Sequence, residues 1–160
     1  MSNLVIGLLI GVIAGGLVVG LVFWKMMPKM MLNIKKSKLS FEQTVEMIES
    51  KALAKGWQVP KIYDLQNSLV EAGYKQFGRL KILSMCQPDH AHKILSIEEN
   101  KKISSMMPCR IGVYESADGE TYISQMNIGL MSKMFGGTIE TVMGEVAAEE
   151  HEMIHELVAG

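Results

Sequence analysis

The sequence has few of the features that usually reveal a protein's chemistry. It has two cysteines in 160 residues, and Cys86 and Cys109 are too far apart for a C-x-x-C redox motif or a zinc finger. The 16 basic and 17 acidic residues nearly cancel, so no overall positive field suggests nucleic acid as a partner. Neither a G-x-G-x-x-G motif after a predicted strand nor a phosphate-binding loop is present. The usual signatures of nucleotide binding are therefore missing.

What the chain does have is one long apolar run at its N-terminus. From Leu4 to Trp24 it contains no charged or strongly polar side chain, and about twenty such residues match the length of a helix across a bilayer. The residues before the run carry no basic charge and those after it are bulky, unlike a cleaved signal peptide. We expect a single-pass anchor in the lipid bilayer of the cell membrane over residues 1–25. A juxtamembrane linker and first strand over 26–38 would follow, and then the rest of a soluble domain over 39–160.

Charges around the run predict its orientation. No Lys or Arg precedes the run, and five lysines follow it closely: Lys25, Lys29, Lys35, Lys36 and Lys38. The positive-inside tendency then places the soluble domain in the cytoplasm. Export of the domain stays open as the alternative, because this charge bias is a tendency rather than a law.

Glycines recur within the apolar run at a spacing of four residues. They form two interleaved series: Gly7, Gly11 and Gly15, then Gly16 and Gly20. Small residues one helical turn apart let two helices approach closely in lipid, which favours self-association of the anchor and a homo-oligomer. The alternative is that glycine is simply common in membrane helices.

Downstream of the anchor, the pattern changes to that of one small α+β domain. Ser40 and Gln43 form a capping box that opens an amphipathic helix, which Gly56 ends. Pro60 indicates an edge strand or a bulge, and Thr138 is suited to cap a final helix reaching Leu157. Further strands are expected at 31–38, 57–65, 79–86, 103–107, 110–116 and 121–126, with short helices near 66–78 and 88–96. This order predicts an antiparallel-sheet sandwich with two main helices on one face.

Several stretches together resemble a known family. They are "GWQVPKIYDLQNSL", "KILSMCQPDHAHKIL" and "MMPCRIGVYESADGETYISQMNIGLMSKMFGG", of which M-P-C-R before G-V-Y-E and the C-x-P at Cys86 are the most specific parts. With these, the chain resembles the membrane-anchored branch of domain-of-unknown-function family 302. The resemblance implies a small α+β domain with a curved antiparallel sheet and a tendency of members to pair. It implies no established reaction.

The C-terminal peptide "HEMIH" matches the H-E-x-x-H pattern of helical zinc proteases. At about 100° per residue, however, His151 and His155 point away from the apolar stripe of the predicted helix. A zinc protease needs both histidines in a cleft together with a third ligand. We interpret the pair as part of a solvated, glutamate-rich helix face, with a metal site at His151 and His155 as a weaker alternative. Protease activity is not expected, and the sequence as a whole favours a protein that is not an enzyme.

A second set of residues offers stronger thiol or metal chemistry. It consists of Cys86, His90, His92, Met107, Cys109 and Arg110. Cys86 precedes a helix beginning near Pro88, whose amides could favour its thiolate, and Arg110 could do the same for Cys109. Sulfur ligands suit Cu(I), and Met or His can hold haem iron. The competing interpretation is that free cysteine packs as a small buried hydrophobe.

Fourteen methionines are many for this length. Most are expected to fill irregular parts of the core. Met131, Met134 and Phe135 could instead form an exposed apolar loop that docks a protein partner or the bilayer.

Two hypotheses from different classes remain. The first is a membrane-anchored module whose cytoplasmic domain self-associates and binds another protein or a small ligand. The second is a metal, haem or thiol protein that handles copper, sulfur or electrons at the membrane.

Overall fold

The computed structural model describes residues 2–74 and 77–159. Its helices are α1 (Ser2–Met31), α2 (Phe41–Ala54), α3 (Leu65–Glu71), α4 (Pro88–Leu95), the 3-10 helix η1 (Glu98–Met106), α5 (Ile128–Ser132) and α6 (Gly137–Ile154). Its strands are β1 (Leu32–Lys36), β2 (Gln58–Asp64), β3 (Leu80–Cys86), β4 (Cys109–Glu115) and β5 (Thr121–Met126). The predicted loop after α3 includes residues 75–76, which lie outside the described residues.

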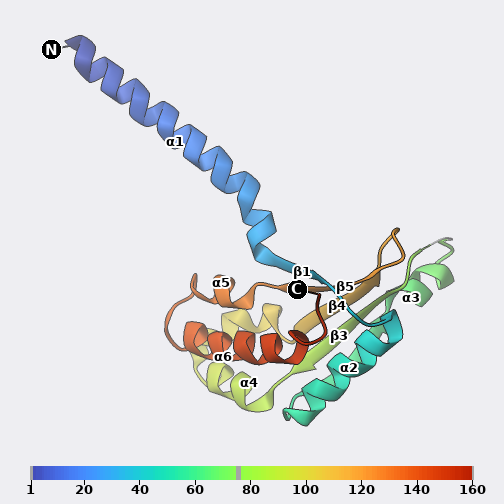
Figure 1. The fold of residues 1–160 in the computed structure, drawn as a ribbon. Coiled ribbons are helices and arrows are strands. Elements are labelled where there is room, and N and C mark those ends of the chain that lie inside the picture. Colours follow the sequence, from blue (N-terminus) through green and yellow to red (C-terminus); the bar gives the residue numbers. More distant parts are fainter. Residues whose placement is uncertain (1, 75–76, 160) are drawn as a thin grey trace.

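The five strands form one antiparallel sheet in the order β1-β5-β4-β3-β2. Figure 1 shows α2, α4 and α6 gathered on one side of this sheet, while α1 extends away from the domain as a separate rod. The predicted α+β class, with an N-terminal apolar helix and two main helices, α2 and α6, on one face of an antiparallel sheet, is confirmed.

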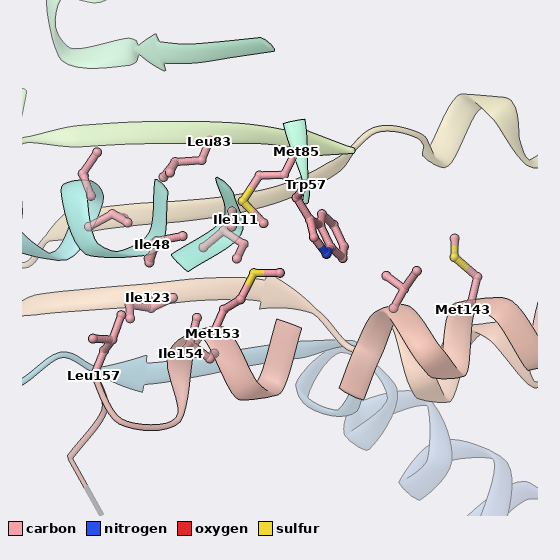
Figure 2. Packing of buried hydrophobic residues seen from close by; sticks show 14 of the residues in the cluster. Ile48, Trp57, Leu83, Met85, Ile111, Ile123, Met143, Met153, Ile154 and Leu157 are labelled. Carbon is pink, nitrogen blue, oxygen red and sulfur yellow. The ribbon is translucent and has the colours of Figure 1, made fainter. Parts of the chain in front are cut away.

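The core lies between the sheet and these helices. Because neighbouring residues of a strand point to opposite faces, Leu83 and Met85 of β3 lie on the same face as Ile111 of β4. These three side chains are fully buried and meet Ile48 of α2 and Met153 of α6 (Figure 2). Each buried side chain of this size contributes roughly 1.5–3 kcal/mol, so this layer fixes the position of α6 over the sheet.

Local signals set several element boundaries as predicted. The Gln43 side chain accepts a hydrogen bond from the Ser40 backbone N–H at 3.3 Å, as in the predicted capping box, and α2 begins at the next residue. Gly56, after the end of α2, has a φ of 78°. The strand that contains Pro60 lies at an edge of the sheet, and its pairing with β3 shifts register between Gln58 and Lys61.

Three segments differ from the prediction. Residues 103–107 were expected to form a strand but lie mostly in η1, where only Ile103 is buried, because a short apolar run does not distinguish strand from helix. The helix α1 continues to Met31, past the expected end of the anchor at residue 25. The last helix begins at Gly137 rather than after Thr138, since Gly136 adopts a φ of 67° as its N-cap.

Candidate functional site

A cavity of about 160 Å³ lies beside Cys109, where η1, β4, β5, α5 and α6 meet. We call it the Cys109 cavity. Its lining includes Met106, Cys109, Met126, Met131, Phe135 and Met143. Pockets for drug-sized ligands measure roughly 300–1,000 Å³, so this volume suits an ion or a small group rather than a haem.

The carboxyl group of Glu150, on α6, forms a hydrogen bond with the thiol of Cys109. Only 2% of Glu150 is exposed. Burial raises the pKa of Glu150 to about 7, although its hydrogen bond with Cys109 acts in the opposite direction. Burial also raises the pKa of the Cys109 thiol, and the Glu150 charge adds to that effect. Around neutral pH, the Cys109 thiol is therefore protonated, and the Glu150 carboxyl group is present in both its neutral and its ionised form.

A second cavity of about 160 Å³ is lined by Glu150, and we call it the Glu150 cavity. Its polar lining residues are Asn33, Gln125, Asn127, Glu150 and His151. Met126 and Ile128 line both cavities, so the two spaces adjoin. Glu150 thus lines the polar cavity and forms a hydrogen bond with Cys109, which lines the sulfur-rich one.

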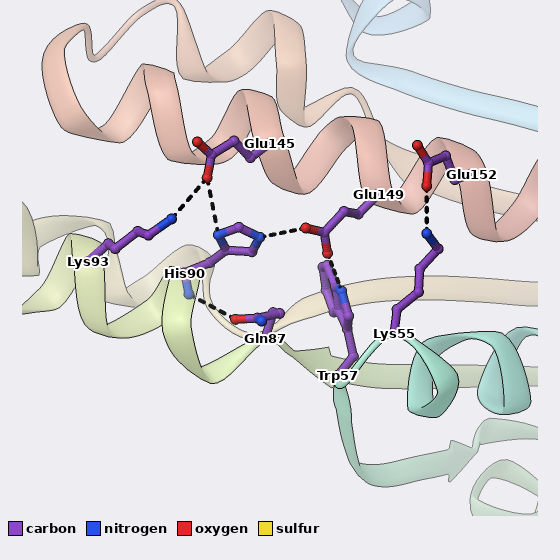
Figure 3. Close-up of polar contacts among 8 residues, drawn as sticks. All are labelled: Lys55, Trp57, Gln87, His90, Lys93, Glu145, Glu149 and Glu152. Carbon is purple, nitrogen blue, oxygen red and sulfur yellow. Dashed lines mark hydrogen bonds and ion pairs between the residues drawn. The ribbon is translucent and has the colours of Figure 1, made fainter.

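A polar network close by ties α6 to the rest of the domain (Figure 3). The Glu149 carboxylate accepts a hydrogen bond from Trp57 Nε1 at 2.6 Å and lies 2.9 Å from His90 Nε2. The other ring nitrogen of His90 lies 3.5 Å from Glu145. Burial alone would raise the pKa of Glu149, but the hydrogen bonds from His90 and Trp57 outweigh it and the pKa is lowered. The hydrogen bond between His90 Nε2 and Glu149 therefore joins α4 to α6, while His90 Nδ1 has no hydrogen-bond partner in the part of the chain that the structure describes.

The structure does not bring the predicted thiol and metal set together as one site. His92 and Arg110 are exposed, and Met107 is half-buried against the core. The pairing of Cys109 with Met85 directs Cys86, the next residue of β3, to the opposite face of the sheet. No group of three or more His, Cys, Asp or Glu side chains is placed to hold a metal ion among the described residues.

The expected lowering of the thiol pKa values is wrong. Burial raises the pKa of Cys86, despite the nearby start of α4, and it raises that of Cys109 further. Arg110 also lines the Cys109 cavity, but it is exposed to water and does not offset the effect of burial on the pKa of Cys109.

The remaining predicted residues lie at the surface of the domain. His151 and His155 are exposed on α6 and their rings stack with centroids 5.8 Å apart. Met134 is 75% exposed and Phe135 is 41% exposed after α5, while Met131 turns inward and lines the Cys109 cavity. Met134 is therefore the most exposed of the three, whereas Phe135 and Met131 both line the Cys109 cavity.

Two residues of the site were missed in the sequence. Glu150 was assigned to a solvated glutamate face and is instead buried, because it falls four residues from both Val146 and Ile154 on the inward stripe of α6. Gln125 follows the inward positions Thr121 and Ile123 of β5 at the same alternation. In both cases the periodicity of the element predicts a buried position, but a polar residue at that position was taken to be exposed.

Comparison with known proteins places this geometry in a family. A family model described as "Domain of unknown function DUF302" matches residues 33–159. The chain belongs to the DUF302 family. The match includes both cavities and leaves out α1. No curated protein matches the chain.

A solved structure has the same fold. The chain is similar to an uncharacterized conserved DUF302 protein from Bacillus stearothermophilus, known from a crystal structure, with a TM-score of 0.71 and 19% sequence identity. The similarity covers 80% of this chain and 98% of the other. It supports the α+β architecture of DUF302 for this chain and supplies no reaction.

Proposed function

We propose that this DUF302 protein is a membrane-anchored binding and assembly module. The observation that carries the proposal is the bare apolar surface of α1. Its segment Val5–Met31 is long and apolar enough to cross a membrane, and none of the most apolar window is buried by the domain. A soluble protein rarely exposes so large an apolar surface, whereas a bilayer would cover it.

The charges beside α1 support a cytoplasmic domain. Lys25 and Lys29 lie in the last turns of the helix, and more lysines follow in β1. Positive residues next to a transmembrane helix stay preferentially on the cytoplasmic side. Asn127 at the start of α5 hydrogen-bonds to Met30 and Met31, and Met131 of α5 lines a pocket with Pro28 and Met31. With α1 in a bilayer, α5 would therefore lie near the membrane surface.

The glycines of α1 support self-association. A Cβ atom built at Gly7, Gly11 or Gly15 meets no other atom of the chain within 4 Å, so the groove along that series is open. A second copy of the helix would fill it by close backbone packing, which is how apolar helices associate in lipid. Such pairing would give the module its oligomeric form.

Cross-linking in membranes tests this assembly. Gly11→Ile and Gly15→Ile together should reduce the dimer fraction at least several-fold, because the larger side chains hold the backbones apart. Leu17→Phe is the matched control, since at 100° per residue its side chain lies on neither glycine series. Equal cross-linking of wild type, glycine variant and control would refute association through α1.

The Cys109 cavity favours a second candidate function, the handling of Cu(I). Four methionines, Met106, Met126, Met131 and Met143, line the same small space as Cys109. Thioether and thiolate sulfur are soft ligands that select Cu(I), and binding would have to displace the thiol proton. This interpretation retains Cys109 and methionine sulfur as the copper ligands of the sequence-based hypothesis and leaves out His90 and His92.

Copper binding is tested on detergent-purified protein without a metal-binding tag. Elemental analysis and Cu(I) titration against a competing chelator should show about one ion per chain, because the Cys109 cavity would hold a single ion. Cys109→Ser should abolish this binding, whereas Cys86→Ser, on the opposite face of the sheet, should retain it. Equal binding by both variants, or none by the wild type, removes this candidate.

A further inference from the structure

Two buried side-chain oxygens without a hydrogen-bond partner line the same cavity. They are Oε1 of Glu150 and Oε1 of Gln125, whose residues are 2% and 9% exposed. Both residues line the Glu150 cavity. Buried polar atoms are nearly always paired in folded proteins, so two unpaired acceptors on residues that line one space indicate a ligand that brings donors.

The rest of the lining narrows the class of ligand. No Lys or Arg lines the Glu150 cavity among the described residues, and the one basic side chain in its lining is His151. The side chain of Asn127 is already used, because it accepts from Leu130 N–H and donates to the Met30 carbonyl. Ile128 and Ala147 complete the wall with apolar surface. The cavity therefore offers acceptors, one acidic group, the ring of His151 and a small apolar wall.

A primary ammonium group fits these features better than a metal ion. It carries three N–H donors on one positive charge, and its alkyl carbon suits the apolar wall. Calcium takes six to eight oxygen ligands and magnesium requires an octahedron, whereas this cavity offers a single carboxyl group. We propose that the Glu150 cavity binds the primary ammonium group of a small amine, with Glu150 and Gln125 as its acceptors.

Binding would also move a proton. Burial raises the pKa of Glu150 to about 7, and of the charged and titratable groups around it only Cys109 adds an effect. An ammonium ion beside the carboxyl would favour its ionised form and lower that pKa. Below pH 7, binding of the amine should therefore release a proton from Glu150.

Calorimetric titration of the full-length protein in phosphatidylcholine nanodiscs tests the proposal. The choline headgroup has no N–H donor, so the bilayer itself does not compete. Methylammonium chloride should bind saturably at pH 6.5, and the heat should differ between two buffers of unlike ionisation enthalpy because a proton is released. Tetramethylammonium and sodium chloride at equal ionic strength should not bind.

Variants separate the cavity from the rest of the surface. Glu150→Gln should lose the proton release and weaken methylammonium binding at least ten-fold. Gln125→Met should also weaken it, and serves as the second variant should Glu150→Gln fold poorly. Glu140→Gln, an exposed change on the same helix, should bind as the wild type does.

The source of the amine is tested in the same system. Nanodiscs containing phosphatidylethanolamine, which carries a primary ammonium headgroup, should compete with methylammonium if the ligand is a lipid, and should leave binding unchanged if it is a free amine. Saturable binding of tetramethylammonium or sodium, binding without proton release, or no binding of methylammonium would each overturn the proposal. The cavity belongs to the domain, so this result does not depend on whether α1 spans a bilayer.

Discussion

At the scale of single residues, the main feature is a carboxyl group held almost completely away from water. The raised pKa of Glu150 means that its neutral form is favoured in the folded domain. The folded state therefore binds more protons than the unfolded chain between pH 4.5 and about 7, and stability falls as the pH rises through this range. Each unit of pKa difference corresponds to about 1.4 kcal/mol, so the full loss is about 3 kcal/mol.

Glu150→Gln removes this titration while keeping the shape of the side chain. The variant should be more stable than the wild type at pH 8 by up to about 3 kcal/mol, and the difference should vanish near pH 4. Thermal unfolding of the full-length protein in detergent, repeated across pH, measures it. Glu140→Gln on the exposed face of α6 should follow the wild-type curve, and a Glu150→Gln curve parallel to the wild type would contradict the assignment.

Glu149, one residue earlier, has a structural role. Its carboxylate accepts from Trp57 and faces His90, so Glu149→Gln leaves at least one of these donors without a good acceptor. The free energy of unfolding should fall by about 1–3 kcal/mol. Glu152→Gln breaks only an exposed ion pair with Lys55 and should cost less than about 1 kcal/mol. Denaturant unfolding that ranks the two variants equally would show that the network does not join the helices.

At the scale of elements, the start of α6 depends on its N-cap residue, Gly136. Gly136 combines a φ of 67° with a ψ of −176°, a region that other residues rarely adopt. Gly136→Ala should destabilise the protein by about 1–3 kcal/mol. Gly144→Ala, in the middle of the helix with no atom near its added Cβ, should instead stabilise it by up to about 1 kcal/mol. Thermal shifts of the same sign for both variants would contradict this account of α6.

The same elements explain how far the sequence could predict the structure. The helix after Ser40 and the edge strand at Pro60 were predictable because each combines a periodic pattern with a local signal, a capping box in the first and a proline in the second. Residues 103–107 lack such periodicity, and their conformation is set by how Ile103 packs. The two cavities were not predictable, since each arises where several separate elements converge. The one indication in the sequence was that Glu150 falls on the inward-facing side of α6, together with Val146 and Ile154.

At the scale of the whole molecule, a DUF302 domain with two small cavities follows directly after a bare apolar helix. In a bilayer, the short link from Met31 to β1 would hold the domain close to the lipid surface, since the strand begins at the next residue. Ligand binding by the domain and pairing through α1 could then be coupled by proximity alone.

Membrane extraction with protease protection tests the central claim, that α1 anchors the domain on the cytoplasmic side. The native protein should stay in the membrane fraction after alkaline carbonate washing. A protease should remove the domain in inverted vesicles and spare it in right-side-out vesicles, as the lysines after the apolar run predict. Release by carbonate would contradict the anchor, and cleavage only in right-side-out vesicles would contradict the orientation.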